Sequence, residues 1–174
     1  MNLQDARALL NHPDISIDVP QTWADLGCGA GLFTSALSYQ LAYGSKIFAV
    51  DKNIKVFKAD QHAGVMFEKV KSDFVLDALN VGNLDGILMA NSFHFVSRKI
   101  EFIHRLARYF RQHESFLIVE YDTNAANAWV PYPISFYSLK DFFFEMGFDY
   151  IEKIHELRSR YSNGNIYSAL IKRS

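Results

Sequence analysis

The stretch 23–34 most constrains the fold of this chain. A short apolar run ends near Asp25, and three glycines then follow at alternate positions, Gly27, Gly29 and Gly31. Glycine lets a backbone turn sharply and lie close to a ligand, because it has no Cβ atom. The N–H groups of such a loop, together with the start of the following helix, favour anionic or oxygen-rich ligands. The stretch therefore predicts a buried strand, a ligand-binding loop and a helix, in that order.

A second acid narrows the kind of ligand. Asp51 ends another apolar run, 47–50, and lies twenty residues beyond Gly31. A carboxylate in this place can accept hydrogen bonds from the hydroxyl groups of a ribose. The glycines do not follow the dinucleotide pattern G-x-G-x-x-G, since counting from Gly27 puts Leu32 where the last glycine is required. A nicotinamide-dependent oxidoreductase is therefore the less favoured nucleotide-binding alternative.

Hydrophobic periodicity predicts alternating strands and helices along the rest of the chain. Strands are expected at 22–26, 46–50, 65–71, 84–90, 116–120, 149–158 and 165–172. Helices are expected at 3–11, at 31–43 with Gly44 as its cap, at 97–112, and from a capping box at 138–141 to Gly147. The pattern at 52–59 fits a short helix but is ambiguous, because it contains Val56-Phe57. Such alternation is typical of a parallel α/β sheet, and Asn163-Gly164 predicts a hairpin turn between the last two strands.

Length and composition indicate one globular domain. The 174 residues fit a single domain, 1–174, in which 1–21 form an N-terminal helix and a linker. Hydrophobic residues make up 49% of the chain, which is enough for a sizeable core. The formal net charge of −1 supplies no basic field for a phosphate backbone, so a nucleic-acid substrate is disfavoured.

Cysteine content and hydropathy bear on metal sites and location. Cys28 is the only cysteine, which excludes an internal disulfide and a cysteine metal cluster, and we expect no metal. The N-terminus lacks the charged and apolar segments of a signal peptide, and no apolar run reaches the ~18–20 residues of a membrane span. We therefore expect a cytoplasmic protein with no membrane partner.

The acid, the spacer and the G-x-G-x-G loop resemble motif I of the class I S-adenosylmethionine-dependent methyltransferases. Asp51, the sequence Ser72-Asp73-Phe74 and the apolar strand 84–90 follow at the intervals of that family. The resemblance covers about residues 20–174. It implies a three-layer Rossmann-like fold with a mostly parallel seven-stranded sheet and an antiparallel C-terminal hairpin, the seventh strand lying between the fifth and the sixth. It also implies S-adenosylmethionine as the cofactor.

The resemblance assigns cofactor contacts residue by residue. Asp25 and the 27–31 loop would hold the methionine end and approach the ribose, and Asp51 would bind the ribose hydroxyl groups. Asp73 would accept from the adenine amine, and the backbone N–H of Phe74 would face the ring. The implied cofactor set is Asp25, Gly27, Cys28, Gly29, Gly31, Asp51, Asp73, Phe74 and Asn91, the last beside the methionine moiety. One departure is Lys52, where an apolar residue often packs on the adenine, which leaves Asn53 or Ile54 for that role.

The methyl acceptor is expected beyond the carboxyl ends of the strands, where open α/β sheets bind ligands. The connection 121–137 after the fifth strand is long enough for a lid or a substrate loop. Its aromatic residues Trp129 and Tyr132 suit a flat or apolar substrate, and we expect Tyr121 and Arg160 to contact substrate as well. The same aromatic residues would equally serve to cover the sheet edge or to form a homodimer contact.

Catalysis of direct methyl transfer depends mainly on alignment, which contributes on the order of 7–11 kcal/mol in well-oriented reactions. A general base is needed only for a protonated acceptor and adds about 10²–10⁴-fold. His94 is the first candidate base, because an unperturbed histidine titrates near neutrality, and Glu120 is the second. A purely structural hydrogen-bonding role for His94 is the competing interpretation.

The segment 91–94 excludes some acceptor classes. It lacks the Asn/Asp-Pro-Pro-aromatic motif that enzymes methylating amino groups of DNA bases carry there, and no cysteine follows the fourth strand as cytosine C5 enzymes require. The sequence therefore predicts a methyltransferase acting on an oxygen or nitrogen atom of a small molecule. The alternative is a non-catalytic S-adenosylmethionine-binding or protein-interaction module on the same fold.

Overall fold

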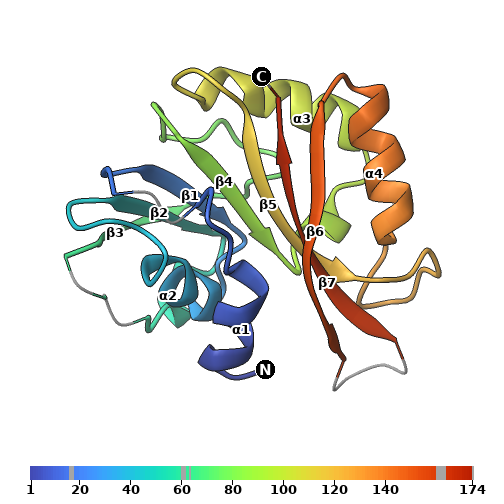
Figure 1. Ribbon diagram of the computed structural model, residues 1–174, viewed down its shortest axis with the longest axis horizontal. Coiled ribbons are helices and arrows are strands. Elements are labelled where there is room, and N and C mark those ends of the chain that lie inside the picture. Colours follow the sequence, from blue (N-terminus) through green and yellow to red (C-terminus); the bar gives the residue numbers. More distant parts are fainter. Residues whose placement is uncertain (16–17, 60–61, 63, 160–163, 174) are drawn as a thin grey trace.

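The computed structural model describes residues 1–15, 18–59, 62, 64–159 and 164–173. Within these residues one seven-stranded sheet has the order β3-β2-β1-β4-β5-β7-β6 (Figure 1). The strands are β1 (Thr22–Leu26), β2 (Lys46–Asp51), β3 (Met66–Lys71), β4 (Gly86–Ala90), β5 (Ser115–Tyr121), β6 (Tyr150–Arg158) and β7 (Asn165–Lys172). The helices are α1 (Leu3–Leu10), α2 (Leu32–Ser38), α3 (Lys99–Leu106) and α4 (Phe136–Glu145), with 3-10 turns η1 (Ile54–Val56), η2 (Phe93–Phe95) and η3 (Ala107–Tyr109).

The strand directions confirm the predicted fold class. β1 to β5 pair in parallel, whereas β7 lies antiparallel between β5 and β6. The chain order reverses at β1, which has β2 on one side and β4 on the other. This is the switch point of an open α/β sheet, beyond whose carboxyl edge ligands bind. We predicted the turn of the β6–β7 hairpin at Asn163-Gly164, and Asn163 lies outside the described residues.

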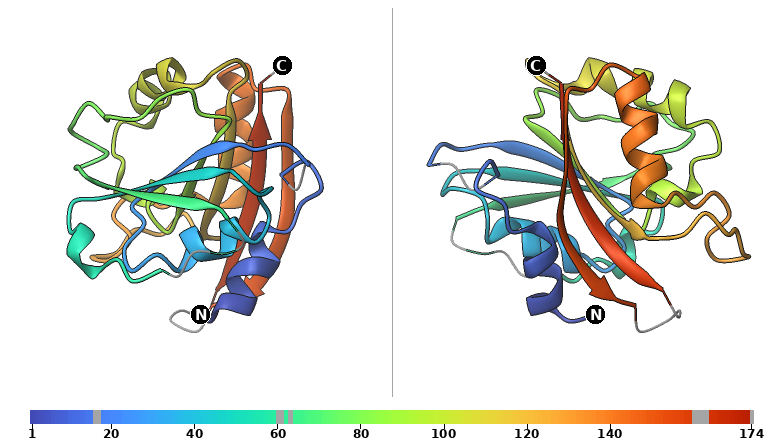
Figure 2. Two further views of the ribbon diagram at one scale, coloured as in Figure 1. Left: turned by 90° about the vertical axis from the view of Figure 1, so that its left-hand side faces the viewer. Right: turned by 45° about the vertical axis from the view of Figure 1, so that its right-hand side comes forward.

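Helices cover both faces of the sheet, as Figure 2 shows with α1 and α4 on opposite sides of the C-terminal strands. Successive residues of a strand point to opposite faces. In β5, Phe116 and Ile118 join the core under α3 and α4, whereas Leu117 and Val119 join the core under α1 and α2. The apolar runs seen in the sequence are therefore strands buried on both faces.

One glycine of the sheet is required by close packing. Trp23 of β1 and Gly86 of β4 are paired neighbours, and a Cβ atom at Gly86 would collide with the Trp23 ring. Trp23 is almost fully buried, and its indole N–H donates to the Gln21 side chain at 2.8 Å. This contact fixes the spacing of the two strands whose ends flank the switch point.

α2 is shorter than the sequence predicts. It ends at Ser38, and the Tyr39 N–H bonds to the Ala36 carbonyl, the tighter spacing that closes a helix. The prediction of a helix over 31–43 is wrong after Ser38, and Gly44 is not its cap.

α4 begins earlier than the sequence predicts. Ser135 is its N-cap, since the Ser135 side chain accepts from the Ser138 N–H, and the Phe136 N–H donates to the Asp122 carboxylate at 2.9 Å. Ser138 therefore lies inside the first turn rather than opening a capping box. The connection between β5 and α4 spans 122–135, three residues fewer than the predicted 121–137.

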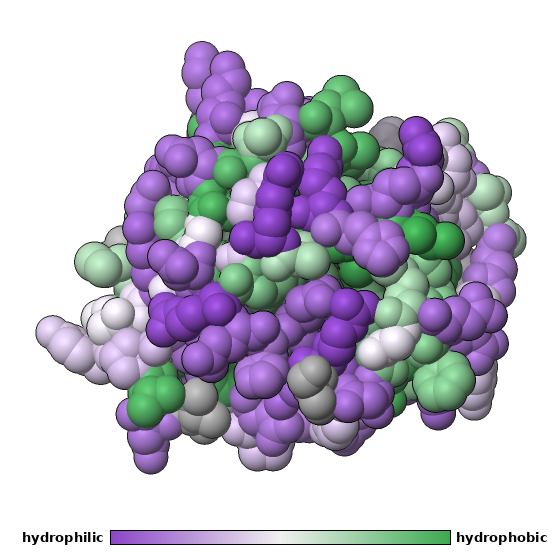
Figure 3. All heavy atoms as spheres, turned by 90° about the horizontal axis from the view of Figure 1, so that it is seen from above, coloured by the Kyte–Doolittle hydropathy of each residue, from purple (hydrophilic) through white to green (hydrophobic). Residues whose placement is uncertain are grey.

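The outer surface is largely polar, and Figure 3 shows hydrophilic side chains surrounding smaller hydrophobic patches on the face seen from above. None of the helices in the described part of the chain combines the length and the apolar character needed to cross a membrane.

Candidate functional site

A cavity of about 400 Å³ opens at the carboxyl ends of β1, β2, β3 and β4. Its volume is within the range of small-molecule and cofactor sites. Its lining residues come from the loops that follow these strands: Gly27, Asp51, Lys52, Asp73, Phe74, Val75, Leu76, Asn91, Ser92 and Phe95. The switch point of the sheet thus carries a cavity of the size that a nucleoside-containing ligand needs.

The glycine loop is held close to the segment after β4. Gly27 has φ +82, and a Cβ atom there would lie 2.6 Å from the Cβ atom of Ser92. The Gly27 N–H donates to the Val50 carbonyl at 2.8 Å, and the Ser92 hydroxyl donates to the Leu26 carbonyl at 2.6 Å. Only glycine satisfies both the backbone conformation and the close approach at this position.

The Asp51 carboxylate is oriented by two backbone N–H groups. One oxygen accepts from the Gly29 N–H at 3.0 Å, and the other accepts from the Asn53 N–H at 2.7 Å. These bonds hold the carboxylate at the edge of the cavity beside the glycine loop. Each oxygen keeps a further lone pair that can accept from a ligand hydroxyl group.

Asp73 and Phe74 form the opposite wall of the cavity. The Asp73 side chain accepts from the Val75 N–H at 3.0 Å, and the Asp73 N–H donates to Asp77 at 2.8 Å. The guanidinium of Arg105, on α3, donates to the Phe74 carbonyl at 2.6 Å. These bonds shape a tight turn whose outer side faces the cavity.

Asn91, at the end of β4, combines an uncommon backbone conformation with an unsatisfied side chain. Its φ is +52, in the left-handed region, and its N–H donates to the Val119 carbonyl at 2.8 Å. Its Oδ1 atom is buried and finds no hydrogen-bond donor among the described residues. Because buried polar atoms are nearly always paired, this oxygen is an acceptor available to a ligand.

His94 and Glu120 form a buried pair behind the cavity. Glu120 accepts from the His94 backbone N–H at 3.1 Å, and its other oxygen lies 2.7 Å from His94 Nδ1. Neither residue lines the cavity, but the neighbouring Phe95 does, with its ring centroid 4.3 Å from that of His94. Nδ1 is committed to Glu120, which leaves Nε2 as the second ring nitrogen.

A family model described as "Methyltransferase domain" matches residues 24–118. The chain belongs to this methyltransferase family. The match begins in β1 and runs to β5, so it includes the glycine loop, Asp51, Asp73, Asn91 and His94. No curated protein matches the sequence.

Solved structures agree with the methyltransferase assignment at the level of fold. A SAM-dependent methyltransferase from Aquifex aeolicus is 19% identical, with a TM-score of 0.66 over 98% of this chain and 90% of that one. Burkholderia thailandensis 1,6-didemethyltoxoflavin-N1-methyltransferase is 16% identical, with a TM-score of 0.70 over 99% and 78%. Magnesium protoporphyrin IX methyltransferase from Synechocystis is 14% identical, with a TM-score of 0.63 over 99% and 78%. These findings confirm the predicted family and support S-adenosylmethionine as the cofactor.

The methyltransferase cavity fits this cofactor. Gly27 leaves space that a side chain would fill, and Asn91 Oδ1 is a buried acceptor for which the described residues supply no donor. Asp51 and Asp73 add carboxylate acceptors on two other sides. A ligand with hydroxyl and amino donors distributed along its length would satisfy all three.

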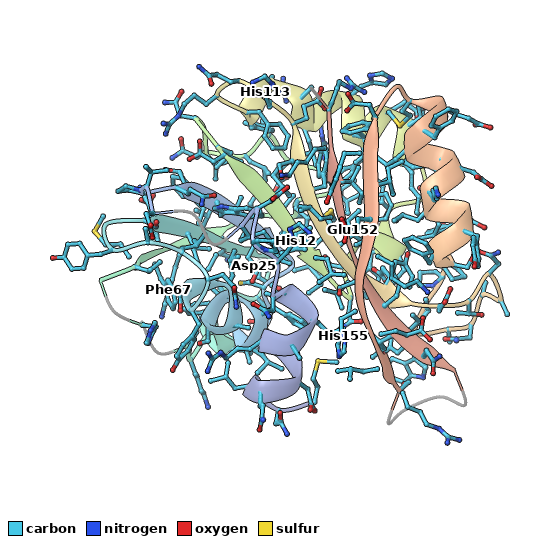
Figure 4. The ribbon with its side chains drawn as sticks, in the orientation of Figure 1. His12, Asp25, Phe67, His113, Glu152 and His155 are labelled. Carbon is cyan, nitrogen blue, oxygen red and sulfur yellow. The ribbon has the colours of Figure 1, made fainter. Side chains whose placement is uncertain are left out.

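Four of the predicted cofactor residues are not among those that line this cavity: Asp25, Cys28, Gly29 and Gly31. Asp25 is fully buried beside α2 (Figure 4), where it accepts from the Thr34 hydroxyl at 2.6 Å. Burial raises the pKa of Asp25 to about 7 and also raises the pKa of the Cys28 thiol, which disfavours its thiolate form. Asp25 thus fixes the start of α2 and, through it, the glycine loop.

The predicted substrate residues differ in whether they contact His94 or lie in solvent. The Tyr132 N–H donates to the His94 carbonyl at 3.0 Å, and the Tyr121 ring lies 6.3 Å from the His94 ring. Trp129 is 85% exposed at the outer part of the 122–135 connection. Arg160 lies outside the described residues. The structure thus brings Tyr121 and Tyr132 to His94 and leaves Trp129 in solvent.

Sequence reasoning assigned no role to Val75 and Leu76, which line the cavity. Both follow Phe74 closely, so they lie beside a residue that the motifs did identify. Ser92 and Phe95 also line the cavity, and they belong to the segment after the fourth strand, where the sequence predicts ligand binding. The position of these residues next to strand ends was the available signal. Lys99, whose ammonium bonds to the Val96 and Tyr132 carbonyls, had no sequence signal, because it lies among the charged residues at the start of a helix.

Proposed function

We propose that this chain transfers a methyl group from S-adenosylmethionine directly to an oxygen or nitrogen atom of a small molecule. The observation that carries the proposal is the cavity at the switch point, whose acceptors Asp51, Asp73 and Asn91 Oδ1 converge from three separate loops. The glycine loop closes the fourth side. This is the arrangement by which a mostly preformed site recognises one elongated polar ligand.

Each wall of the cavity has a role in this proposal. Asp51, held by two loop N–H groups, would accept from the ribose hydroxyl groups. Asp73 would accept from the adenine amine, and the Phe74 N–H would face the ring. Asn91 Oδ1 would accept from the amino group of the methionine moiety. When bound, the cofactor supplies an activated methyl group on a sulfonium centre, so the chain mainly has to align the acceptor.

His94 is the candidate base, and Glu120 is its orienting partner. The bond to Glu120 fixes the plane of the imidazole and holds Nδ1, so Nε2 is the nitrogen that would take a proton from an acceptor. Both side chains are buried, which protects the pair from water. A non-catalytic binding module is the second candidate function, because neither residue lines the cavity.

The acceptor is proposed to be flat or apolar. The neighbours from Burkholderia and Synechocystis are named for a toxoflavin precursor and a porphyrin, both small molecules. In this chain the Phe95 and Tyr121 rings lie near the His94 ring, and the Tyr132 backbone bonds to the His94 carbonyl. Trp129 is exposed on the same 122–135 connection. Aromatic rings of this kind stack on planar ligands. A cytoplasmic location belongs to the same proposal, and the exposed aromatic residues leave a homodimer contact as their other use.

Calorimetric titration with S-adenosylmethionine and with S-adenosylhomocysteine tests the cofactor site. We expect micromolar binding of both, and about a tenfold to hundredfold weaker binding in Asp51→Ala, since a charge-assisted hydrogen bond is lost. Asp141→Ala, a change on the exposed side of α4, is the matched control and should bind like the wild type. Failure of the wild type to bind either compound would refute the proposal.

A screen of acceptors separates catalysis from binding alone. Phenols and small acids are incubated with labelled S-adenosylmethionine, and methyl transfer is compared between the wild type and His94→Gln. We expect transfer by the wild type and a loss of about 10²-fold or more in the variant. Equal rates would remove the base role from His94, and cofactor binding without transfer to any acceptor would favour the non-catalytic module.

A further inference from the structure

Lys99, the first residue of α3, joins two segments that are distant in sequence. Its ammonium group donates to the Val96 carbonyl at 2.8 Å and to the Tyr132 carbonyl at 2.8 Å. Tyr132 also donates its own N–H to the His94 carbonyl at 3.0 Å. Both backbone polar groups of Tyr132 are therefore tied to the turn that carries His94, one of them through Lys99.

The surroundings of Lys99 act on its ammonium in opposite directions. Burial lowers the pKa of Lys99 to about 8, and the nearby Glu120 carboxylate partly offsets this by raising it. The ammonium also lies 5.0 Å from the centre of the Phe93 ring and 5.8 Å from that of Tyr132. A partly buried cation is expensive unless it is paired, and here two carbonyls, two rings and Glu120 compensate for the lost water.

The 122–135 connection has two parts that differ in burial. The part next to α4 is anchored, because the Tyr167 hydroxyl donates to the Ile134 carbonyl at 2.9 Å and Val130 and Ile134 are buried. The part at 124–129 is exposed. Tyr132 lies in the anchored part, so the bonds of Lys99 fix the edge of the connection that touches His94.

We propose that Lys99 is a positioning residue, which holds Tyr132 against the His94 turn and so sets the shape of the acceptor side next to the cavity. That this is the acceptor side rests on the proposed function, whereas the bonds to Tyr132 and Val96 do not. Loss of the ammonium would leave two carbonyls in a partly buried place without their donor and would free Tyr132 from α3. The connection would then open locally while the sheet stayed intact.

Hydrogen exchange at the Tyr132 amide, followed by NMR, tests the proposal without any ligand. Tyr132 lies between Pro131 and Pro133, which have no amide hydrogen, so it is the only residue of the segment 131–133 whose amide exchange can be followed. In Lys99→Met we expect exchange at Tyr132 to be about tenfold faster, as the loss of a charged donor implies, with Leu117 and Ile118 of β5 unchanged. Lys99→Arg, which can still reach two carbonyls, should restore most of the protection.

The controls separate a positioning role from a general loss of stability. Lys140→Met removes a lysine from the exposed face of α4 and should leave exchange at Tyr132 unchanged. If Lys99→Met also exposes the β5 amides, Lys99→Gln, which keeps a polar end, is measured in its place. An increase of less than about twofold at Tyr132 in the folded variant, or no recovery in Lys99→Arg, would overturn the proposal. Titration of the wild type with S-adenosylhomocysteine tests the proposed function separately, so the two can fail independently.

Discussion

The cavity and the proposed acceptor side next to it are built differently. Around the cavity, short loops follow adjacent strands, and their N–H groups bond to the ends of neighbouring strands, as Gly29 does to the Asp51 carboxylate and Gly27 to the Val50 carbonyl. On the proposed acceptor side, a long connection returns over the sheet, and bonds at Tyr132 and Ile134 tie it to His94 and Tyr167. The comparison shows that the cavity loops are held by bonds between adjacent strand ends, whereas the proposed acceptor side depends on bonds from one long connection to distant segments. Loops on a rigid scaffold are where binding preferences diverge.

The largest expected effect concerns Asp25, which bonds to Thr34 at the start of the helix that follows the glycine loop. Its pKa is raised from 3.8 to about 7 by burial, so the folded chain takes up a proton between those values. The contribution of Asp25 to the free energy of unfolding is therefore greatest at low pH. It falls as the pH rises toward 7, by about 4 kcal/mol at most, because the buried carboxyl group must then lose its proton. Asp25→Asn should abolish this decline and unfold at a higher urea concentration than the wild type at pH 8.

Urea unfolding at pH 4, 6 and 8 measures the Asp25 effect. Asp141→Asn, on the exposed side of α4, is the control and should keep the wild-type decline. An Asp25→Asn variant with the same pH dependence as the wild type would show that Asp25 does not carry the effect.

The next effect concerns the glycine loop itself. Gly27→Ala should weaken S-adenosylhomocysteine binding about 100-fold, because the new Cβ atom would meet Ser92 in a backbone conformation that alanine avoids. Gly29→Ala is the matched control, since its Cβ atom would meet nothing within 4 Å and only the strain of φ +52 remains. Equal losses in both variants, measured by calorimetry, would show that strain alone matters and that the contact with Ser92 does not.

A smaller effect is expected at the anchor of the acceptor side. Tyr167→Phe removes the buried bond to the Ile134 carbonyl and should lower the free energy of unfolding by about 1–2 kcal/mol. Binding of S-adenosylhomocysteine should not change, because Tyr167 does not line the cavity. Tyr137→Phe, at an exposed position of α4, controls for the loss of a hydroxyl group. Weaker cofactor binding in Tyr167→Phe would break the distinction between the two sides.

The smallest effect on stability is expected at Trp129. Because this side chain is 85% exposed, Trp129→Ala should change the free energy of unfolding by less than about 0.5 kcal/mol. Cofactor affinity should also be preserved, whereas transfer to an aromatic acceptor identified by screening should fall. Unchanged transfer would remove Trp129 from the acceptor side and leave it as a surface residue or a homodimer contact.

Much of the fold was predictable because it depends on local patterns. The expected strands at 22–26 and 165–172 match β1 and β7, since apolar runs bounded by polar turns are read directly from the sequence. Helix ends were less predictable, as the early end of α2 and the early start of α4 show. The start of α4 depends on Asp122, which accepts from the Phe136 N–H across the whole connection.

The sequence by itself determined the family and the chemistry of the loops, because glycines after a strand and acids at two strand ends act through their own backbone and carboxylate groups. Only the tertiary structure decided which of these groups face the cavity. Asp25 turned out to be buried under α2, whereas Asn91 Oδ1 has no donor within the part of the chain that the structure describes, and no local pattern distinguishes the two. His94 and Glu120 met, and Lys99 reached Tyr132, through contacts between distant segments. Burial and long-range pairing set these outcomes, because both depend on how strands and helices pack rather than on the residues beside each group.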